Sequence, residues 1–335
     1  MRAPRALAAP RGLGHKPPGG GESFRAATGG APAFAVAMFR LAHLTDPHVG
    51  PLSRPRLRQL LSKRATGWVN WSRGRKLTHD MAVLEALVAD LRAAAPDHIA
   101  CTGDLCNIGL PSEWETARMF LEALGGPEAV SFVPGNHDAY VRGSLDGLLD
   151  AVGPWTRDDA GGERAFPYLR RRGPLALVGL SSAIPTAPFV ASGRLGTRQI
   201  AAAEALLGSL AREPEAPCRV VMIHHPPHVG GALPGRNLTD ASAVEAMIRR
   251  VGADLVLHGH NHVGSVAFVI GPDGRRVPVI GAPSASARGG ALSHCAGYHL
   301  YEFARTATGY AVTATLRGLL PDDRIGDLGI LTLYG

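Results

Sequence analysis

The chain has 335 residues, of which 45% are hydrophobic and 19% are charged, and its formal net charge is +7. This length and composition are typical of a globular protein with one large or two modest domains. Its four cysteines form no CxxC pair, so we expect reduced thiols in a cytoplasmic protein rather than the disulfide framework of a secreted one. No apolar run reaches the ~18–20 residues that a transmembrane helix requires.

The first 37 residues differ in composition from the rest of the chain. They are rich in Gly, Pro, Ala and Arg and show no helical or strand periodicity. Such a segment buries too little apolar surface to fold, so we predict a disordered extension over 1–37. A secretory signal is not favoured, because the apolar run at 31–39 leads into the first expected strand without a polar cleavage region. Met38 directly precedes the first expected strand, so one interpretation is that residues 1–37 are a dispensable extension or follow from a wrongly chosen start.

From Met38 onward, short β-rich runs alternate with helical patterns, which indicates an α/β architecture. Four helices are expected where apolar residues at helical spacing follow a residue suited to cap a helix, namely Thr78, Ser112, Thr197 and Thr239 or Asp240. Ser112 also forms a capping-box pattern with Glu115. After residue 262, two strands around the turn at 271–274 and two later strand-like runs predict antiparallel pairing, hence a mixed or second sheet. We assign 319–335 to a C-terminal tail.

Five strand-like runs end in polar groups of the metal-binding type. These are Asp46-Pro47-His48, Gly103-Asp104, Gly135-Asn136-His137-Asp138, His224-His225-Pro226 and Gly259-His260-Asn261-His262. Because ligands gather at the carboxyl ends of strands in an α/β sheet, we expect these groups to converge. The glycines that precede three of them permit tight turns where the backbone must come close. Imidazoles and carboxylates without cysteine suit Mn, Fe or Zn rather than a closed structural zinc site.

Each motif alone is a weak signal, since Asp-x-His and Gly-Asp arise by chance and paired histidines also occur in cores. Their joint order, D-x-H, GD, GNHD, H-x-P and GHxH, resembles the calcineurin-like metallophosphoesterase superfamily from about Met38 to Phe303. GNHD and GHxH resemble the branch that contains the bacterial class III cyclic-nucleotide phosphodiesterases. The resemblance implies a four-layer αββα sandwich of two mixed β-sheets flanked by helices, which we place at 38–318.

The resemblance also implies a centre of two metal ions. The ligands of one ion would be Asp46, His48 and His262, and those of the other Asn136, His224 and His260. Asp104 would bridge both ions through its two carboxylate oxygens. Two cations ~3.5–4 Å apart neutralise the charge of a phosphate and lower the pKa of a bridging water, which supplies hydroxide for in-line attack.

His137 is not a ligand in this scheme. It would face the scissile phosphate and protonate, or hydrogen-bond, the leaving oxygen, a task that suits the unperturbed pKa of histidine. Asp138 would orient His137 or belong to a surface loop. His225 and His228 are candidates for the substrate pocket. We treat the histidines without a matching motif as structural or exposed, and these are His15, His43, His79, His98, His258, His294 and His299.

A basic segment over 52–77 follows the first motif. Eight basic residues and no acidic residue lie between Asp46 and Asp80. Leu57, Trp68 and Trp71 fall near one helical face, and Gly67 is expected to break the helix in two. The segment is either a solvated helix whose apolar face packs on the domain, or a cap that contacts an anionic membrane or a phosphorylated, acylated substrate.

Three functions remain open at this point. The leading one is a dinuclear metal-dependent phosphodiesterase. The second is a UDP-2,3-diacylglucosamine hydrolase at the inner face of the membrane, which the basic cap favours, although the best-known branch of that family has Arg where His137 stands here. The third is a non-catalytic scaffold, for which degraded ligands would be expected. The absence of a DNA-reading motif argues against nucleic acid.

Overall fold

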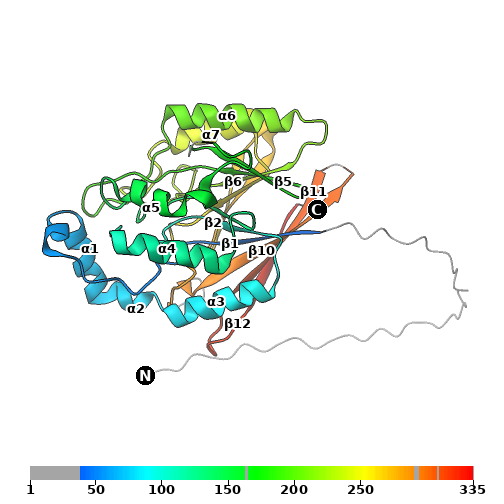
Figure 1. The fold of residues 1–335 in the computed structure, drawn as a ribbon. Helices are drawn as coiled ribbons and strands as arrows, with labels where there is room; N and C mark the ends of the chain where they lie inside the picture. The colour runs from blue at the N-terminus through cyan, green and yellow to red at the C-terminus, as the bar shows by residue number, and fades with distance from the viewer. Residues whose placement is uncertain (1–37, 163–164, 290–293, 308, 335) are drawn as a thin grey trace, which may run out of the picture. The chain divides into compact units, whose positions relative to one another are not determined.

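The computed structural model describes residues 38–162, 165–289, 294–307 and 309–334 (Figure 1). The predicted extension at 1–37 lies outside the described residues. Within these ranges, no helix is both long and apolar enough to cross a bilayer.

Two six-stranded sheets form the centre of the fold. The first has the order β12 (Ile325–Tyr334), β11 (Gly309–Leu319), β10 (Gly297–Thr306), β1 (Phe39–Leu44), β2 (His98–Cys101) and β3 (Val130–Phe132). The second has the order β4 (Tyr168–Arg172), β5 (Leu175–Gly179), β6 (Cys218–Met222), β7 (Leu255–His258), β9 (Arg276–Gly281) and β8 (Ser265–Ile270). Both are mixed. In the first sheet, β1, β2 and β3 are parallel and the other half pairs antiparallel, whereas in the second sheet antiparallel strands at both edges flank a parallel centre.

Helices cover the outer faces of the two sheets (Figure 1). The first sheet packs against α3 (Met81–Ala93), α4 (Pro111–Leu124) and α5 (Ser144–Val152), and the second against α6 (Thr197–Ala211) and α7 (Ala241–Val251). Short 3-10 helices follow α5 at Gly153–Thr156 and β8 at Pro272–Gly274. A third core lies between the sheets. Strand alternation explains this division: in β1, Leu41 enters the core between the sheets, while Ala42 enters the core under the helices. The αββα prediction is confirmed.

Two helix starts differ from the prediction. Asp80, not Thr78, caps α3, and its Oδ1 accepts hydrogen bonds from the backbone of Ala82 and Val83. Helix α4 begins two residues early, at Pro111 with Leu110 rather than Ser112 as the preceding cap position, because a proline at the first position needs no hydrogen-bond partner for its nitrogen. The capping carboxylate there belongs to the buried Glu113 rather than to Glu115. Helix α6 begins at Thr197 itself, with Gly196 at the cap position, and α7 begins directly after Asp240, as predicted.

The assignment of 319–335 to a tail is wrong. Residues 325–334 form β12, which pairs with β11 along its length. Leu331 and Leu333, which flank Thr332, pack on the core between the sheets and are partly buried there, so this edge strand directs a row of apolar side chains inward.

The basic segment forms a helical insert between β1 and α3. It contains a 3-10 turn at Leu57–Leu60, α1 (Arg64–Asn70), a π-helical stretch at Trp71–Arg75 and α2 (Lys76–Thr78). Gly67 does not break the helix; it lies buried inside α1, where a side chain would collide with the Tyr140 hydroxyl. The predicted apolar face is divided, since Trp68 and Trp71 stack on each other and pack on the domain, while Leu57 is 84% exposed.

Candidate metal centre

The five predicted motifs converge where strands of both sheets end. Asp46 and His48 follow β1, Asp104 follows β2 and Asn136 follows β3 in the first sheet. The residues contributed by the second sheet follow β6 and β7, and they are His224, His260 and His262. The parallel arrangement of β1–β3 and of β6–β7 places these ends at the same edge.

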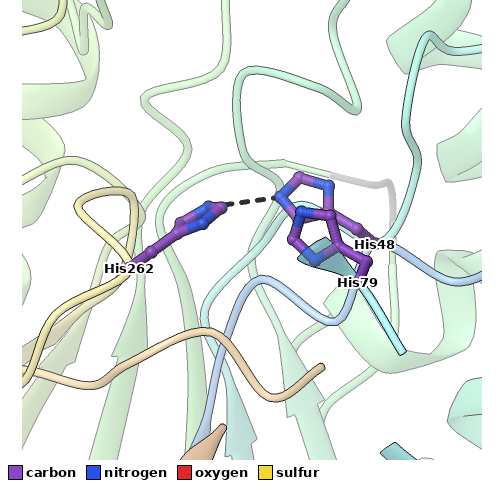
Figure 2. Close-up of side chains that lie close together, drawn as sticks. All are labelled: His48, His79 and His262. Atoms are coloured by element: carbon purple, nitrogen blue, oxygen red, sulfur yellow. Dashed lines mark hydrogen bonds between the residues drawn. The ribbon is translucent and has the colours of Figure 1, made fainter. Parts of the chain in front are cut away.

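Asp46, His48 and His262 form one half of the site. The Nε2 atom of His262 lies 3.1 Å from Asp46 Oδ1 and 3.3 Å from His48 Nε2. His79 joins this group from the helical insert, and its ring lies 4.5 Å from the ring of His48, centroid to centroid (Figure 2). His48, His79 and His262 present ligand atoms within 4.8 Å of one another.

Asn136, His224 and His260 form the other half. Oδ1 of Asn136 lies 2.8 Å from His260 Nδ1 and 3.2 Å from His224 Nε2. Asp104 lies between the halves, because its Oδ2 is 3.4 Å from Nε2 of His224 and 3.8 Å from Nε2 of His48. This is the position that a bridging carboxylate requires.

Backbone carbonyls orient two of the imidazoles. His48 Nδ1 lies 3.0 Å from the carbonyl oxygen of Cys106, and His224 Nδ1 lies 2.7 Å from that of Thr102. A carbonyl accepts only from a protonated nitrogen, so in the neutral ring Nδ1 carries the proton and Nε2 keeps its lone pair. This lone pair faces the site, as second-shell hydrogen bonds arrange it for metal ligands.

The fit of a cation can be judged from Asp46 Oδ1. This buried oxygen makes no hydrogen bond within the described residues. The Nε2 atoms of His262, His48 and His224 surround it at 3.1, 3.9 and 4.0 Å. Burying a carboxylate oxygen without a partner costs free energy, and a divalent cation shared with these imidazoles would remove that cost. The residues therefore fit a metal.

The sequence matches a known family over most of its length. Residues 39–264 match the profile of the calcineurin-like phosphoesterases. The chain belongs to this family.

Two solved structures show the same fold. A purple acid phosphatase from seeds of yellow lupin (Lupinus luteus) superposes with a TM-score of 0.56 at 14% identity, covering 88% of this chain and 54% of the other. A 5′-nucleotidase precursor from Thermus thermophilus gives a TM-score of 0.50 at 18% identity, covering 86% and 56%. This chain thus spans little more than half the length of either protein. No curated protein sequence matches it.

The backbone of this phosphoesterase is unusual at the ligand positions. Five of the seven candidate ligands have φ between 41° and 72°, and they are Asp46, His48, Asp104, His260 and His262. The predicted close approach at the glycines is also present. A side chain at Gly259 would collide with Thr45 and Asp46, and one at Gly135 would collide with Asp104.

Nearby carboxylates strongly shift the pKa of His224. Burial lowers the pKa of this imidazole, but the carboxylates of Asp104 and Asp46 outweigh burial and raise it to about 10. In the other half, burial and the positive charge of Arg75 hold the pKa of His48 well below its usual value. The two carboxylates thus create a negative potential that attracts cations to the side of His224.

His137 lies beside the metal ligands, as predicted for a residue that acts on the phosphate. Its backbone nitrogen donates to Asp104 Oδ1 at 2.7 Å, and its Nδ1 contacts the carbonyl oxygen of Asn107. Burial and Arg75 lower its pKa to about 3, so the ring is neutral near pH 7. A neutral ring with Nδ1 protonated offers an acceptor at Nε2, so protonation of a leaving oxygen requires that Nε2 first gain a proton, which an anionic phosphate beside the ring favours.

Asp138 is neither in a surface loop nor placed to orient His137. It is fully buried, and its carboxylate accepts hydrogen bonds from the backbone nitrogens of Gly135, Asp104 and Cys106 at 2.8, 2.9 and 3.0 Å. Burial and the nearby charge of Asp104 raise the pKa of Asp138, while the backbone donors of Gly135 and Cys106 oppose this. Asp138 therefore ties together the two loops that carry Asp104 and Asn136.

A pocket of about 670 Å³ opens beside His137. The helical insert forms one wall with Lys63, Trp71 and Arg75, and Phe189 and Arg236 stand among the residues of the remaining wall. Neither His225 nor His228 lines it, so the structure does not support their predicted role. His225 is buried, and Ser182 and the carbonyl of Ala191 occupy its two ring nitrogens.

Sequence reasoning missed Arg75 and His79. The sequence analysis counted Arg75 only as a charge and treated His79 as structural or exposed. The structure places both side chains at the ligands, and His79 also hydrogen-bonds Ser286 through Nδ1 at 2.8 Å. Their spacing of four residues, which puts two side chains on one helical face, was the available signal.

Proposed function

We propose that this phosphoesterase binds two divalent metal ions and hydrolyses phosphodiester or phosphoanhydride bonds. The observation that carries the proposal is the convergence of seven candidate ligands where strands of both sheets end, with three imidazoles around Asp46 Oδ1, a buried oxygen without a hydrogen bond in the described chain. The ions, when bound, would neutralise the charge of the phosphate and lower the pKa of a water molecule so that hydroxide attacks near neutral pH.

The protein side chains have separate tasks in this reaction. Asp104 holds both halves of the site together, because its carboxylate reaches His48 and His224. His137 borders the pocket next to Asn136, where the leaving oxygen of a bound phosphate would lie. The volume of the pocket falls in the range of small-molecule sites, which supports a substrate with a sizeable group attached to the phosphorus.

The test combines metal analysis with a hydrolysis screen. We expect two equivalents of Mn, Fe or Zn per chain and turnover of bis-(p-nitrophenyl) phosphate, with cyclic nucleotides and UDP-diacylglucosamine assayed in parallel. A protein that takes up no metal from a buffer containing all three ions, and hydrolyses none of these esters, would contradict the proposal.

A second candidate is hydrolysis of a lipid-linked substrate such as UDP-2,3-diacylglucosamine at an anionic membrane. Leu57 and Leu61 are 84% and 88% exposed, and the exposed Arg54, Arg56 and Arg58 lie beside them. Each basic residue near an anionic bilayer contributes about 1 kcal/mol, and exposed leucines add apolar insertion. The two tryptophans contribute less than the sequence suggested, because they pack on the domain.

Liposome co-sedimentation at low and high salt tests this candidate. The variant changes Arg54, Arg56 and Arg58 to Gln, and leaves Lys63 and Arg64 in place because both make hydrogen bonds that anchor the insert. The matched control is the triple change of Arg198, Arg212 and Arg249 to Gln, which removes the same charge from α6 and α7 and their ends. Binding by wild type and control, but not by the first variant, supports membrane contact. Absence of wild-type binding at low salt would contradict it.

A further inference from the structure

Arg75 extends from the helical insert into the metal centre. Its Nη1 lies 2.8 Å from His137 Nε2, and its Nη2 lies 2.9 Å from His48 Nε2. On the other side of the guanidinium, Nε lies 3.4 Å from His79 Nε2. Three imidazole lone pairs therefore accept from this one half-buried cation.

The cation has no anionic partner at contact distance. In the described part of the chain, no carboxylate oxygen lies within 4.0 Å of the Arg75 guanidinium, although Asp104 and Asp46 act on it over longer distances. The three neutral imidazoles accept hydrogen bonds from the guanidinium but leave its charge uncompensated. Desolvating an unpaired charge is costly, and an anion with matching geometry would recover that cost.

The fold holds this side chain in place. Arg75 ends the π-helical stretch Trp71–Arg75, a type of helix that is rare and often occurs at functional sites. Trp71 at the start of the stretch packs against the cluster that contains Ile108 and Tyr140. The other end of the insert is fixed by Lys63, whose Nζ donates to Thr186 Oγ1 at 2.7 Å and to the carbonyl oxygen of Val190 at 3.0 Å.

The pocket beside His137 has the electrostatics of an anion site. Lys63, Arg73, Arg75 and Arg236 line it, and no acidic residue is among its described lining residues. Arg75 lies at the inner end, where the pocket reaches Asn136 and His137. An anionic group that enters the pocket therefore meets the guanidinium next to the candidate ligands.

We propose that Arg75 is a substrate-binding residue that grips the phosphate oxygens of the ester, with its planar fork matching two oxygens of one phosphorus. This inference rests on the proposed function, which makes a phosphate ester the substrate. The guanidinium also donates a hydrogen bond to Nε2 of His48, which is a candidate metal ligand. A cation bound by this Nε2 would displace the guanidinium from it. Removing Arg75 should therefore weaken phosphate binding without lowering metal content.

The experiment compares wild type with Arg75→Gln and Arg75→Lys, and Lys76→Gln serves as the matched control. Lys76 is exposed, adjacent in sequence and equal in charge, and it does not line the pocket. Binding of inorganic phosphate is measured by calorimetry on the Mn²⁺-loaded and on the metal-free protein, together with metal content, melting temperature and KM and kcat for bis-(p-nitrophenyl) phosphate. The melting temperature identifies a variant that fails to fold.

We expect Arg75→Gln to bind phosphate about 10- to 100-fold more weakly in both forms, as for loss of a charge-assisted hydrogen bond, with unchanged metal content. Arg75→Lys should lie in between, because it keeps the charge and loses the fork. Lys76→Gln should match wild type. Loaded Arg75→Gln that binds phosphate like wild type would overturn the inference and leave the proposed function intact. If the wild-type protein takes up no metal and hydrolyses no ester but binds phosphate through Arg75, the proposed function is overturned and Arg75 remains a phosphate-binding residue.

Discussion

Replacement of Asp138 by Asn tests whether this carboxylate holds the site together. In the folded protein, Oδ2 accepts from the backbone of Asp104 and Gly135, and Oδ1 accepts from Cys106. An asparagine side chain of the same shape keeps one acceptor oxygen. The NH2 group of the asparagine then replaces Oδ1 and faces the backbone N–H of Cys106. Two donors cannot bond each other, so the Cys106 nitrogen becomes buried without a partner.

The expected loss of stability follows from these three hydrogen bonds. A hydrogen bond to a charged group contributes about 1.5–3 kcal/mol, and a buried unsatisfied donor costs about 1–3 kcal/mol. These two values are not added, because both describe the loss of the same Cys106–Asp138 hydrogen bond. Burial and Asp104 raise the pKa of Asp138, so its ionised form costs free energy that asparagine does not, and this offsets part of the loss. We therefore expect Asp138→Asn to lower the free energy of unfolding by about 1–2 kcal/mol. Asp138→Ala orphans all three donors and should lower it by about 4–5 kcal/mol.

Urea unfolding at pH 8, where the carboxyl group is ionised, measures this difference. Asp146→Asn is the control, because Asp146 is exposed in the first turn of α5 and its loss should change stability by less than about 0.5 kcal/mol. If Asp138 oriented His137 instead, Asp138→Asn would lose activity with a free energy of unfolding within about 0.5 kcal/mol of wild type. That result would refute the structural role.

Three further predictions concern single side chains. Asp104→Ala should lose both metal occupancy and turnover in metal analysis and hydrolysis assays, and two retained equivalents with a near-normal rate would contradict its bridging role. His137→Ala should keep its metal but lose about 10²–10⁴-fold in rate with a poor leaving group and less with p-nitrophenolate, whereas equal losses would exclude a role in leaving-group protonation. Asp90 accepts from Arg317 at 2.7 and 2.8 Å, and these bonds lower its pKa, so Asp90→Asn should reduce stability by about 1–2 kcal/mol at pH 7. A carboxyl group with a lowered folded pKa stabilises the fold above its unfolded pKa of about 3.9, and this stability is lost as pH falls through the folded pKa. The urea curves of the two proteins should therefore approach each other as pH falls below about 3.9, and a constant difference would contradict this.

Much of the fold was predictable from local patterns. Apolar runs followed by polar ligand groups identified the strands β1, β2, β3, β6 and β7, and the order of the motifs identified the residues that meet at their ends. Helix boundaries were less predictable when several residues competed as caps. Glu113, for example, caps the backbone upstream of α4 from a buried position that sequence spacing does not reveal.

The missed parts of the site depend on tertiary contacts. Arg75 and His79 reach the ligands only because the insert folds back against His48 and is fixed through Lys63 at Val190, residues far apart in sequence. Asp138 looked catalytic because it follows His137 in the chain. Its side chain instead points to the backbone of a different loop, and that direction is set by the packing of β2 beside β3.

At the five candidate ligand positions with left-handed backbone, the residue that would be most stable differs from the residue that the site needs. For residues other than glycine this conformation costs about 1 kcal/mol, somewhat less for aspartate, and a glycine would relieve it. Selection for stability alone would therefore favour glycine at positions such as His48 and His260, and each such change would remove a ligand. A descendant that kept the fold only as a scaffold should lose its site first at these positions. Sequence-based stabilisation of this protein would meet the same conflict, so these five positions should be held fixed in any thermostability design.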